Sequence, residues 1–509
     1  MKKIISVKSL EEVVSKLKAK GKKVVLCHGV FDLLHIGHIK HFKEAKKLGD
    51  ILVATVTQDK YVNKGPNRPI FSLNTRMESI AALKDIDYVA PNIFSNAIQL
   101  IKMLKPDIYC KGKDYKNYNL DATSQIKKEA AAIKSVGGKI THTGTVLFSS
   151  SKIINQTNLN LSNEQKSFLN RIKKKKEFNT DNKILSIINY FSNLKVLIIG
   201  ETIIDEYVFC EALGKSGKEP ILVMRDMYKE RYLGGTAAIA RNLSSFCKQI
   251  TLLTNIGQRN EEKHFIKNNL QKNIKTIFLK KSRSPTITKK RFIEHINKTK
   301  IFGVYTLNDQ PLDSTQEKIF NDKVLKYINN HDLVIVSDYG HGLISAKTAE
   351  SIVKKSKFVA VNTQLNSSNL GFHVISKYLG ANLITINETE MHHELRNRTE
   401  DRSSLIKKLS KKLKSNYTHV TSGEEGSTIY NYTTNEILSC PAFANKVVDK
   451  VGTGDSMLAI LAISLYKKFD VKFSMFLSAL VAAHNIQDMS NKTSFNKTYI
   501  TRAAQSYLK

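Results

Sequence analysis

The sequence predicts two doubly wound α/β domains, and three observations support this fold class. Short apolar segments alternate with helical stretches along 24–145 and again from residue 195 onward, a pattern typical of parallel sheets covered by helices. The stretch 156–190 between them is polar and rich in Asn and Lys, as in a linker. The length of 509 residues also exceeds that of one ordinary domain.

The first domain is expected over residues 1–155 and contains five segments of strand character. These are Val24–Cys27, Ile51–Val56, Tyr88–Ala90, Ile108–Cys110 and Lys139–Thr143. Helical spacing of apolar residues predicts helices between them, for example over Leu73–Leu83 and Asn96–Lys105. A linker is expected over 156–191, with helical potential near 163–176 but no clear apolar strand.

The second domain is expected over residues 192–509 and repeats the alternation. Its predicted strands are Lys195–Gly200, Leu333–Ser337, Phe358–Val361, Leu383–Ile386 and His419–Thr421. Helical segments separate them, as in a second doubly wound sheet.

Composition narrows the class of protein. The net charge of +35 favours anionic partners, but the lysines are spread along the chain, so no nucleic-acid role is expected. The five cysteines are scattered without CxxC spacing, which predicts buried free thiols and not a disulfide framework or a zinc site. The chain has neither a signal-type apolar core nor an apolar run long enough for a membrane span. A cytoplasmic location is therefore expected.

The segment Gly29–His38 has the character of a nucleotide site. It follows an apolar strand and opens a helical pattern, so His35 and His38 can both face an anion at the helix N-terminus. Gly37 between them allows that anion to approach the backbone. Two imidazole N–H donors can stabilise charge that develops on a phosphate without a metal.

Together with Arg68–Ser79 and Lys111–Tyr115, this segment resembles the cytidylyltransferase-type nucleotidyltransferases, among them those acting on heptose 1-phosphate and glycerol 3-phosphate. The resemblance implies a Rossmann-like domain that joins a sugar or polyol phosphate to the α-phosphorus of a nucleoside triphosphate. It implies that His35 and His38 stabilise the α-phosphate and that Lys64 neutralises phosphate charge. The implied nucleotide-binding residues are Gly29, Phe31, Arg76, Lys111, Asp114, Ser149, Ser150 and Ser151. The family usually has Ser-Thr-Thr where this chain has three serines, which retain the hydroxyls.

A second phosphate-handling segment, Asp449–Asp455, precedes the apolar run Ser456–Leu461. A turn of small residues that opens a helix directs backbone N–H groups and the helix dipole at one point. An aspartate at that point suits proton removal from a hydroxyl that attacks a phosphate.

With the motifs at Gly234-Gly235, Asn387–Glu390 and Thr421–Gly426, this segment resembles the ribokinase-like (PfkB) sugar kinases across about 192–509. The stretches Ser284–Lys289 and Ser337–Gly342 are similar to heptose-7-phosphate kinases in particular. The resemblance implies that Asp455 is the general base. The other implied roles are an anion hole from Gly452, Thr453 and Gly454, nucleotide binding by Thr421, Gly423 and Gly426, sugar binding by Asp205, Gly234, Gly235 and Asn242, and water-mediated Mg²⁺ binding by Asn387 and Glu390.

Two departures from the heptose kinases concern substrate choice. Ala238 stands where they usually carry Asn, and Asn362-Thr363-Gln364 stands in place of Asp-Pro-Lys. Both changes fall near the expected sugar or phosphate site.

The two resemblances together imply consecutive reactions. The kinase would use ATP to phosphorylate a sugar or sugar phosphate, with heptose 7-phosphate at C1 as the leading candidate. The transferase would then activate the sugar 1-phosphate with a second nucleoside triphosphate, ATP or CTP, for surface polysaccharide synthesis. The oligomeric state stays open, with a homodimer through the kinase domain as one outcome.

Two alternatives remain at this point. One is a CTP-dependent enzyme for a different sugar or polyol phosphate. The other, of a different class, is a regulatory or nucleic-acid-binding protein built on degenerate enzyme domains. The presence of His35, His38, Asp455 and Glu390 argues against degeneration.

Overall fold

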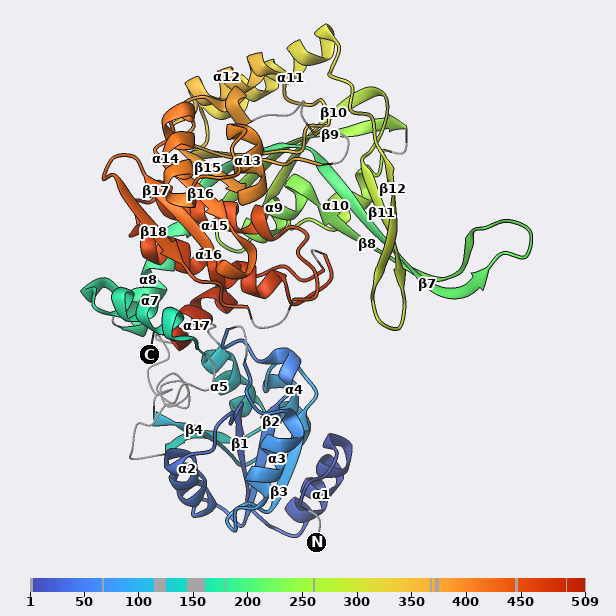
Figure 1. Ribbon diagram of the computed structural model, residues 1–509. Coiled ribbons are helices and arrows are strands. Elements are labelled where there is room, and N and C mark those ends of the chain that lie inside the picture. The colour runs from blue at the N-terminus through green and yellow to red at the C-terminus, as the bar shows by residue number, and fades with distance from the viewer. Residues whose placement is uncertain are drawn as a thin grey trace. The chain divides into compact units, whose positions relative to one another are not determined.

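A computed structural model describes residues 3–65, 68–113, 125–143, 161–178, 180–259, 261–366, 369–370, 375–444, 447–490 and 492–508. The chain forms two compact units (Figure 1). Unit 1 comprises Met1–Ser186 and Thr498–Lys509, and unit 2 comprises Ile187–Lys497.

Unit 1 contains a five-stranded parallel sheet in the order β3-β2-β1-β4-β5. Its strands are β1 (Val24–Gly29), β2 (Ile51–Thr57), β3 (Tyr88–Asn92), β4 (Ile108–Gly112) and β5 (Lys139–Thr143). The strand order reverses direction between β1 and β4. In open α/β sheets a ligand crevice forms at the carboxyl ends of the strands beside such a reversal.

Helices cover both faces of this sheet. Helices α1 (Val7–Ala19), α4 (Ile98–Leu104) and α5 (Gln125–Ser135) share a hydrophobic core with one face. Helices α2 (Ile36–Lys46) and α3 (Leu73–Ala81) share a second core with the other face. Neighbouring residues of β1 alternate between the cores, as the pleat requires: Leu26 lies in the first, and Val25 and Cys27 lie in the second.

Three further helices lie wholly or mostly in unit 1. They are α7 (Asn163–Lys173), α8 (Asp181–Asn189) and α17 (Lys497–Tyr507). The helical potential expected near 163–176 corresponds to α7, which begins with a capping box between Ser162 and Gln165. The limits expected for the two domains and the linker stay predictions.

Unit 2 contains a nine-stranded sheet in the order β10-β9-β6-β13-β14-β15-β16-β17-β18. Its strands are β6 (Lys195–Gly200), β9 (Gln249–Arg259), β10 (Ile274–Pro285), β13 (Leu333–Asp338), β14 (Val359–Thr363), β15 (Leu383–Asn387), β16 (Tyr417–Thr421), β17 (Ser427–Asn431) and β18 (Glu436–Cys440). The first seven strands in this order, from β10 through β9, β6, β13, β14 and β15 to β16, pair in parallel. Strands β17 and β18 continue the sheet in antiparallel pairing.

Helices cover this sheet as well. Helices α11 (Ser314–Ile328), α12 (Ala346–Lys355), α13 (Glu388–Leu395) and α14 (Arg402–Leu413) share one core with alternate residues of β6 and β13–β16. The remaining helices of the unit are α9 (Gly235–Leu243), α10 (Lys263–Asn268), α15 (Thr453–Tyr466) and α16 (Val471–Asn485). Helices α15 and α16 are almost entirely buried, and α15 contacts strands β13 to β15.

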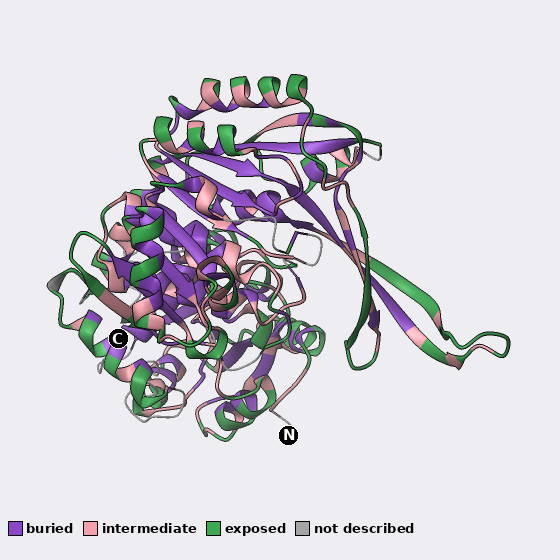
Figure 2. Ribbon diagram, turned by 45° about the horizontal axis from the view of Figure 1, so that its top comes forward, coloured by how far each residue is buried: buried purple, intermediate pink, exposed green. Residues whose placement is uncertain are grey.

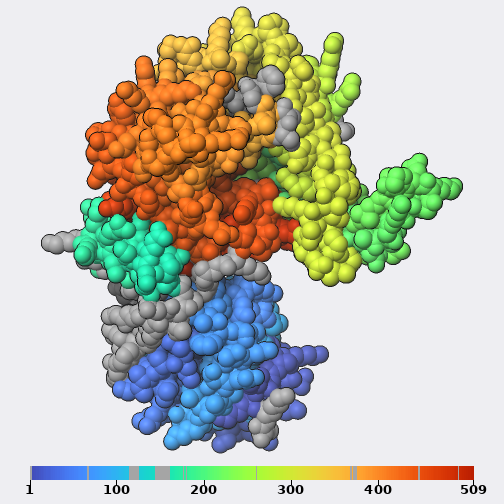
Figure 3. Space-filling model, viewed as in Figure 1, coloured from blue at the N-terminus to red at the C-terminus, as the bar shows by residue number. Residues whose placement is uncertain are grey.

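A second, four-stranded sheet of unit 2 has the order β12-β11-β7-β8. It consists of β7 (Thr202–Lys215), β8 (Leu222–Gly234), β11 (Thr288–Glu294) and β12 (Lys300–Thr306). The β7–β8 hairpin extends away from the nine-stranded sheet as a thin projection (Figure 3). Its outer half is exposed, whereas the strands of the larger sheet are mostly buried (Figure 2).

The predicted fold class is confirmed, since each unit is an α/β structure with a largely parallel sheet. All ten predicted strands occur, and the structure extends most of them by one or two residues. The five cysteines are free and buried, as expected. Among the described residues, no helix combines the length and apolarity that crossing a membrane requires.

Candidate active sites

The histidine pair of unit 1 lies at the start of α2, just beyond the carboxyl end of β1. His35 is the N-cap of α2, and its Nδ1 accepts a hydrogen bond from the Gly37 N–H at 3.1 Å. The rings of His35 and His38 stack, with centroids 3.9 Å apart and planes inclined by 17°. Because Nδ1 of His35 accepts, the neutral ring carries its proton on Nε2, which is then a donor.

Both histidines are held in the neutral form. Burial, followed by the charges of His35 and Lys64, lowers the pKa of His38 to about 3. Burial is also the main cause of the lowered pKa of His35, and Lys64 lowers it further. Lys64 therefore lies close enough to act on both rings, so the structure brings these three predicted residues together.

The turn between β1 and α2 is shaped by Gly29 and Phe31. Phe31 has a φ of 49°, and its ring meets His38 edge to face at 5.4 Å. A Cβ at Gly29 would lie 3.0 Å from the Phe31 ring, so a side chain there would displace the ring that supports His38. The sequence had assigned no role to Asp32, yet its Oδ1 accepts hydrogen bonds from the backbone N–H groups of Ile70 at 2.7 Å and Phe71 at 3.2 Å.

Arg76 lies in the interior of unit 1, with 1% of its surface exposed. Its guanidinium donates to the carbonyl oxygens of Phe71 (2.9 Å), Val30 (2.5 Å) and Thr57 (2.9 Å), and it pairs with Asp59. These contacts join the turn after β1 to the end of β2. They indicate a structural role, and the contact with a triphosphate expected from the resemblance stays a prediction.

The substitution Arg76→Met should destabilise unit 1 strongly. Methionine fills similar volume but leaves three carbonyl oxygens without their donor, and each such loss costs about 1–3 kcal/mol. We expect the free energy of unfolding to fall by at least about 3 kcal/mol, measured by urea denaturation. Lys84→Met, at an exposed position, is the control. A loss equal to that of the control would contradict the structural role of Arg76.

Lys111 lies near the end of β4 and is 9% exposed. Its ammonium group pairs with Glu129 at 3.2 Å and lies 3.4 Å from the carbonyl oxygen of His28. It is thus held beside the end of β1, and nucleotide binding by Lys111 stays a prediction. Asp114, Ser149, Ser150 and Ser151 lie outside the described residues.

In unit 2, Asp455 lies in the first turn of α15. The Ser337 hydroxyl donates to its Oδ1 at 3.0 Å, and the Tyr339 hydroxyl donates to its Oδ2 at 2.5 Å. Both donors come from the end of β13, so the sheet fixes the orientation of the carboxylate. Burial raises the pKa of Asp455, although the two hydroxyls and the charge of Lys289 oppose that rise. A carboxylate of raised pKa is a stronger base.

The turn before α15 has the features of an anion site. Gly452 is the N-cap of α15 and has a φ of 78°, a conformation that strongly favours glycine. The Thr453 hydroxyl has no hydrogen-bond partner in the described part of the chain. A Cβ at Gly454 would lie 3.7 Å from Nδ2 of Asn362, which places one of the two departures from the heptose kinases beside this turn.

Buried charged side chains of the four-stranded sheet lie near Asp455. Asp205 of β7 is 3% exposed and pairs with Arg291 of β11 at 2.5 Å. Lys289, two residues before Arg291, is the strand partner of Asp205. Burial lowers the pKa of Lys289, whereas the charges of Asp205 and Asp455 raise it. No role of Lys289 or Arg291 was predicted from the sequence, although their spacing of two on a strand puts them on one face.

The two glycines at the start of α9 allow close backbone contacts. A Cβ at Gly234 would lie 2.4 Å from Oδ2 of Asp205, and one at Gly235 would lie 2.4 Å from the carbonyl oxygen of Glu201. Asn242, also on α9, is buried and donates to Oγ of Ser456 at 3.2 Å. It therefore supports the start of α15, and direct sugar binding by Asn242 stays a prediction.

Asn387 and Glu390 form a capping box at the start of α13. The Glu390 carboxylate accepts from the backbone N–H groups of Asn387 at 2.8 Å and Leu365 at 3.1 Å. Burial raises the pKa of Glu390 to about 7, and the charge of Asp455 adds to the rise. Two carboxylates that repel each other and retain free lone pairs fit a hydrated Mg²⁺, which prefers oxygen ligands and keeps several waters.

The turn after β16 carries the predicted nucleotide-binding residues Thr421, Gly423 and Gly426. Gly423 and Gly426 have φ values of 59° and 88°. A Cβ at Gly426 would lie 2.1 Å from the carbonyl oxygen of Cys440. The glycines of this turn therefore let its backbone approach that of Cys440 closely. Contact of the turn with a nucleotide stays a prediction.

Glu201 supports the loop after β13 from the interior. It is fully buried, and its two carboxylate oxygens accept from the backbone N–H groups of Tyr339 at 3.0 Å and His341 at 3.2 Å. Burial and the nearby Asp338 raise the pKa of Glu201 from 4.5 to about 7. Because Tyr339 also holds Asp455, this buried acid helps to position the candidate catalytic carboxylate.

The raised pKa of Glu201 predicts a pH-dependent stability of unit 2. The folded state binds the proton more tightly than the unfolded state, so this contribution is complete below pH 4.5 and is lost as the pH rises to about 7. We expect Glu201→Gln to remove up to roughly 3 kcal/mol of that decline in the free energy of unfolding. Urea denaturation across this pH range measures it, with exposed Glu219→Gln as control. Parallel pH profiles for wild type and Glu201→Gln would refute it.

Comparison with known proteins finds similar proteins for both regions of the chain. A cytidylyltransferase-like family profile matches residues 26–156. "Bifunctional protein HldE" of Campylobacter jejuni strain RM1221 is 28% identical over 280 residues, which cover 54% of this chain and 58% of that protein. The protein of the same name from a Nitratiruptor species is 41% identical over 140 residues, or 26% of this chain and 30% of its own. The chain thus spans little more than half the length of the Campylobacter relative.

A solved ribokinase of Arabidopsis thaliana, complexed with ribose and ATP, matches 62% of this chain and 99% of its own with 16% identity and a TM-score of 0.47. The profile of the pfkB family of carbohydrate kinases matches residues 193–498. The order of a cytidylyltransferase-like region followed by a kinase region is the one expected from the two resemblances. Since the kinase profile covers more than half of the chain, the protein belongs to the pfkB family of carbohydrate kinases.

Proposed function

We propose that this protein is a bifunctional transferase that converts a sugar phosphate into a nucleotide-activated sugar in two steps. Unit 2 transfers the γ-phosphoryl group of ATP to the anomeric hydroxyl at C1 of heptose 7-phosphate, releasing ADP. Unit 1 then lets the new 1-phosphate attack the α-phosphorus of a second nucleoside triphosphate, ATP or CTP, and pyrophosphate leaves. The names of the relatives support two activities on one chain.

The observation that carries the kinase step is the anchored carboxylate of Asp455 at the N-terminus of α15. It takes the proton of the acceptor hydroxyl, whose oxygen forms the new bond to phosphorus as the bond to the ADP oxygen breaks. The backbone N–H groups of the Gly452–Gly454 turn and the Thr453 hydroxyl face the transferring group. Mg²⁺, held through water beside Glu390, supplies charge neutralisation on the phosphates when bound.

The acceptor is proposed to lie between this turn and the four-stranded sheet. Asp205 can accept hydrogen bonds from sugar hydroxyls, and Lys289 supplies a buried positive charge beside it. A phosphorylated sugar would gain from that charge, because a buried cation without a full counter-ion attracts an anion strongly. This arrangement favours a sugar phosphate over a neutral sugar.

The nucleotidyl step rests on the stacked pair His35 and His38 together with Lys64. Each neutral ring offers one N–H, and these donors stabilise charge that builds up on the α-phosphate oxygens in the transition state. The α2 N-terminus adds its dipole to the same region. The low pKa of His38 keeps this ring a hydrogen-bond donor and not a fixed cation at neutral pH.

The proposed setting is the cytoplasm, where nucleoside triphosphates and sugar phosphates are available, and the proposed assembly is a homodimer through unit 2. The four-stranded sheet exposes apolar side chains, among them Leu222, Phe302 and Val304, which pairing of two sheets would cover. Sedimentation analysis of the purified protein reads the oligomeric state directly.

The proposal is tested by mass spectrometry of the products formed from heptose 7-phosphate with ATP, CTP and Mg²⁺. We expect heptose bisphosphate to appear first and an ADP-heptose or CDP-heptose to follow. The base on the product identifies the second nucleotide. Leaving out CTP or ATP in turn shows which nucleotide is the phosphoryl donor of the first step and which is the nucleotidyl donor of the second.

A second arm of the assay distinguishes a wrong substrate assignment from a wrong reaction. If pyrophosphate is released with other sugar 1-phosphates, the two-step reaction holds and the substrate assignment is wrong. The Asn362 side chain beside Gly454 would then be the first determinant of substrate choice to examine. If no nucleotide is consumed with any sugar phosphate and binding to nucleic acid depends steeply on salt, the proposed function is wrong.

A further inference from the structure

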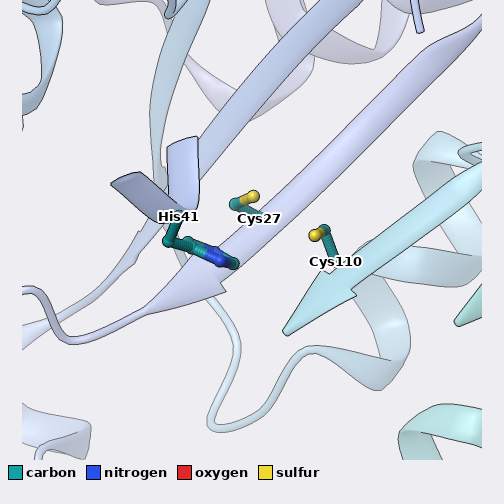
Figure 4. A group of neighbouring side chains, drawn as sticks. All are labelled: Cys27, His41 and Cys110. Carbon is teal, nitrogen blue, oxygen red and sulfur yellow. The ribbon is translucent and has the colours of Figure 1, made fainter. Parts of the chain in front are cut away.

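Two cysteines and a histidine meet in the interior of unit 1, outside the residues used by the proposed chemistry (Figure 4). Cys27 of β1 and Cys110 of β4 are direct partners in neighbouring parallel strands. His41 of α2 packs over the same face of the sheet. The two sulfur atoms and a ring nitrogen of His41 all lie within 4.8 Å of one another.

We propose that Cys27, Cys110 and His41 form a binding site for a thiophilic metal ion, with Zn²⁺ as the expected occupant. Two thiolates and one imidazole are a donor set that zinc prefers. Tetrahedral coordination with zinc bond lengths puts donor atoms roughly 3.5–3.8 Å apart. Side chains that already lie within 4.8 Å of one another reach that geometry by small rotations.

The fourth coordination position is adjacent to Thr143, the last residue of β5. Its hydroxyl lies 2.6 Å from Nδ1 of His41 and 3.2 Å from Sγ of Cys110. The hydroxyl therefore already contacts two of the three metal-binding groups. Either this oxygen or one water molecule completes four ligands, as in zinc sites with three protein ligands.

The charges of the site suit a divalent ion. Binding releases one proton from each thiol, so the dipositive ion is balanced by two thiolates and the buried site stays neutral. All three side chains are buried: Cys27 and Cys110 are 0% exposed and His41 is 9% exposed. A charged complex would be costly in such surroundings.

The consequence for the molecule concerns helix α2. His41 follows His38 by one turn of this helix, and the metal would tie that turn to β1 and β4. The ion would thus hold the histidine pair in a constant position relative to the carboxyl ends of the two central strands. This role is a positioning one, and it does not depend on which nucleotide or sugar unit 1 uses.

The test is a Co²⁺ titration of the full chain, reduced and stripped of metal by a chelator. We expect one equivalent of Co²⁺ to produce a thiolate-to-cobalt charge-transfer band and the visible bands of tetrahedral cobalt. Zn²⁺ should then displace the cobalt and bleach both. The absence of a charge-transfer band in folded wild-type protein, or a Cys27–Cys110 disulfide in freshly isolated protein without metal, would overturn the proposal.

Variants locate the site. Cys110→Val keeps an apolar residue on a buried strand but removes one thiolate, and we expect the affinity for Zn²⁺ to fall at least about 100-fold. Cys440→Ala removes a buried thiol of unit 2 and should leave the metal stoichiometry unchanged. An equal loss of Zn²⁺ affinity in the two variants would place the metal elsewhere and refute the site. If Cys110→Val fails to fold, the wild-type spectrum still decides.

Discussion

Asp455→Asn is expected to abolish the kinase step and to leave nucleotidyl transfer intact. Asparagine retains the shape of the side chain and can still contact Ser337 and Tyr339, but it cannot take a proton from the acceptor hydroxyl. Loss of a general base typically costs about 10²–10⁴-fold in rate. ADP formation with heptose 7-phosphate measures the first step, and pyrophosphate release with a supplied sugar 1-phosphate measures the second.

The control for this variant is Asp401→Asn, which changes an exposed helix N-cap in the same unit. Asparagine caps helices as well as aspartate does, so both activities should persist. Because the pKa of Asp455 is raised by burial, the wild-type kinase should also lose activity as the pH falls below that raised value. Kinase activity of Asp455→Asn close to that of wild type would rule out the general-base role.

His38→Ala should have the reverse effect. It removes one of the two stacked rings that are proposed to donate to the α-phosphate, and loss of one preorganised donor typically costs about 10²–10³-fold in rate. We expect pyrophosphate release to fall accordingly while ADP formation from heptose 7-phosphate is unchanged. The effect should lie mainly in kcat, since the donors act on charge that develops only in the transition state.

Lys40→Ala on the same helix provides the control, because Lys40 is exposed and its removal changes the charge of α2 without touching the histidine pair. A similar loss of rate in Lys40→Ala and His38→Ala would point to general electrostatics and not to a positioned donor. Loss of both activities in a folded His38→Ala protein would contradict two separate sites on one chain.

The sequence was sufficient for all parallel strands of the two larger sheets except β9 and β10. These strands are buried on two faces, so each is a short continuous apolar run that stands out from its neighbours. The four-stranded sheet of unit 2 was not predicted. Its strand β8 is largely exposed and rich in charged residues, so it lacks both the apolar run and a clean alternation.

The sequence also predicted the two candidate phosphate-handling turns, because their glycines, histidines and aspartate are contiguous in the chain. Lys289, Arg291, Ser337 and Tyr339 could not be assigned roles in this way. They reach Asp205 and Asp455 only through strand pairing and loops that join distant segments. Arg76 is the opposite case. Its motif predicts contact with a triphosphate, but its guanidinium donates hydrogen bonds to backbone carbonyl oxygens in the interior of unit 1.

What the sequence by itself determined is therefore the fold class, the order of the cytidylyltransferase-like and kinase-like regions and the residues of the two helix N-termini, since each depends on contiguous patterns. What only the tertiary structure decided is how residues distant in the chain combine. Cys27, His41 and Cys110 have no metal-site spacing, and the sequence predicted simple buried thiols. They meet because β1 and β4 are neighbours in the sheet and α2 packs across them, and packing of separate elements leaves no local signature in the chain.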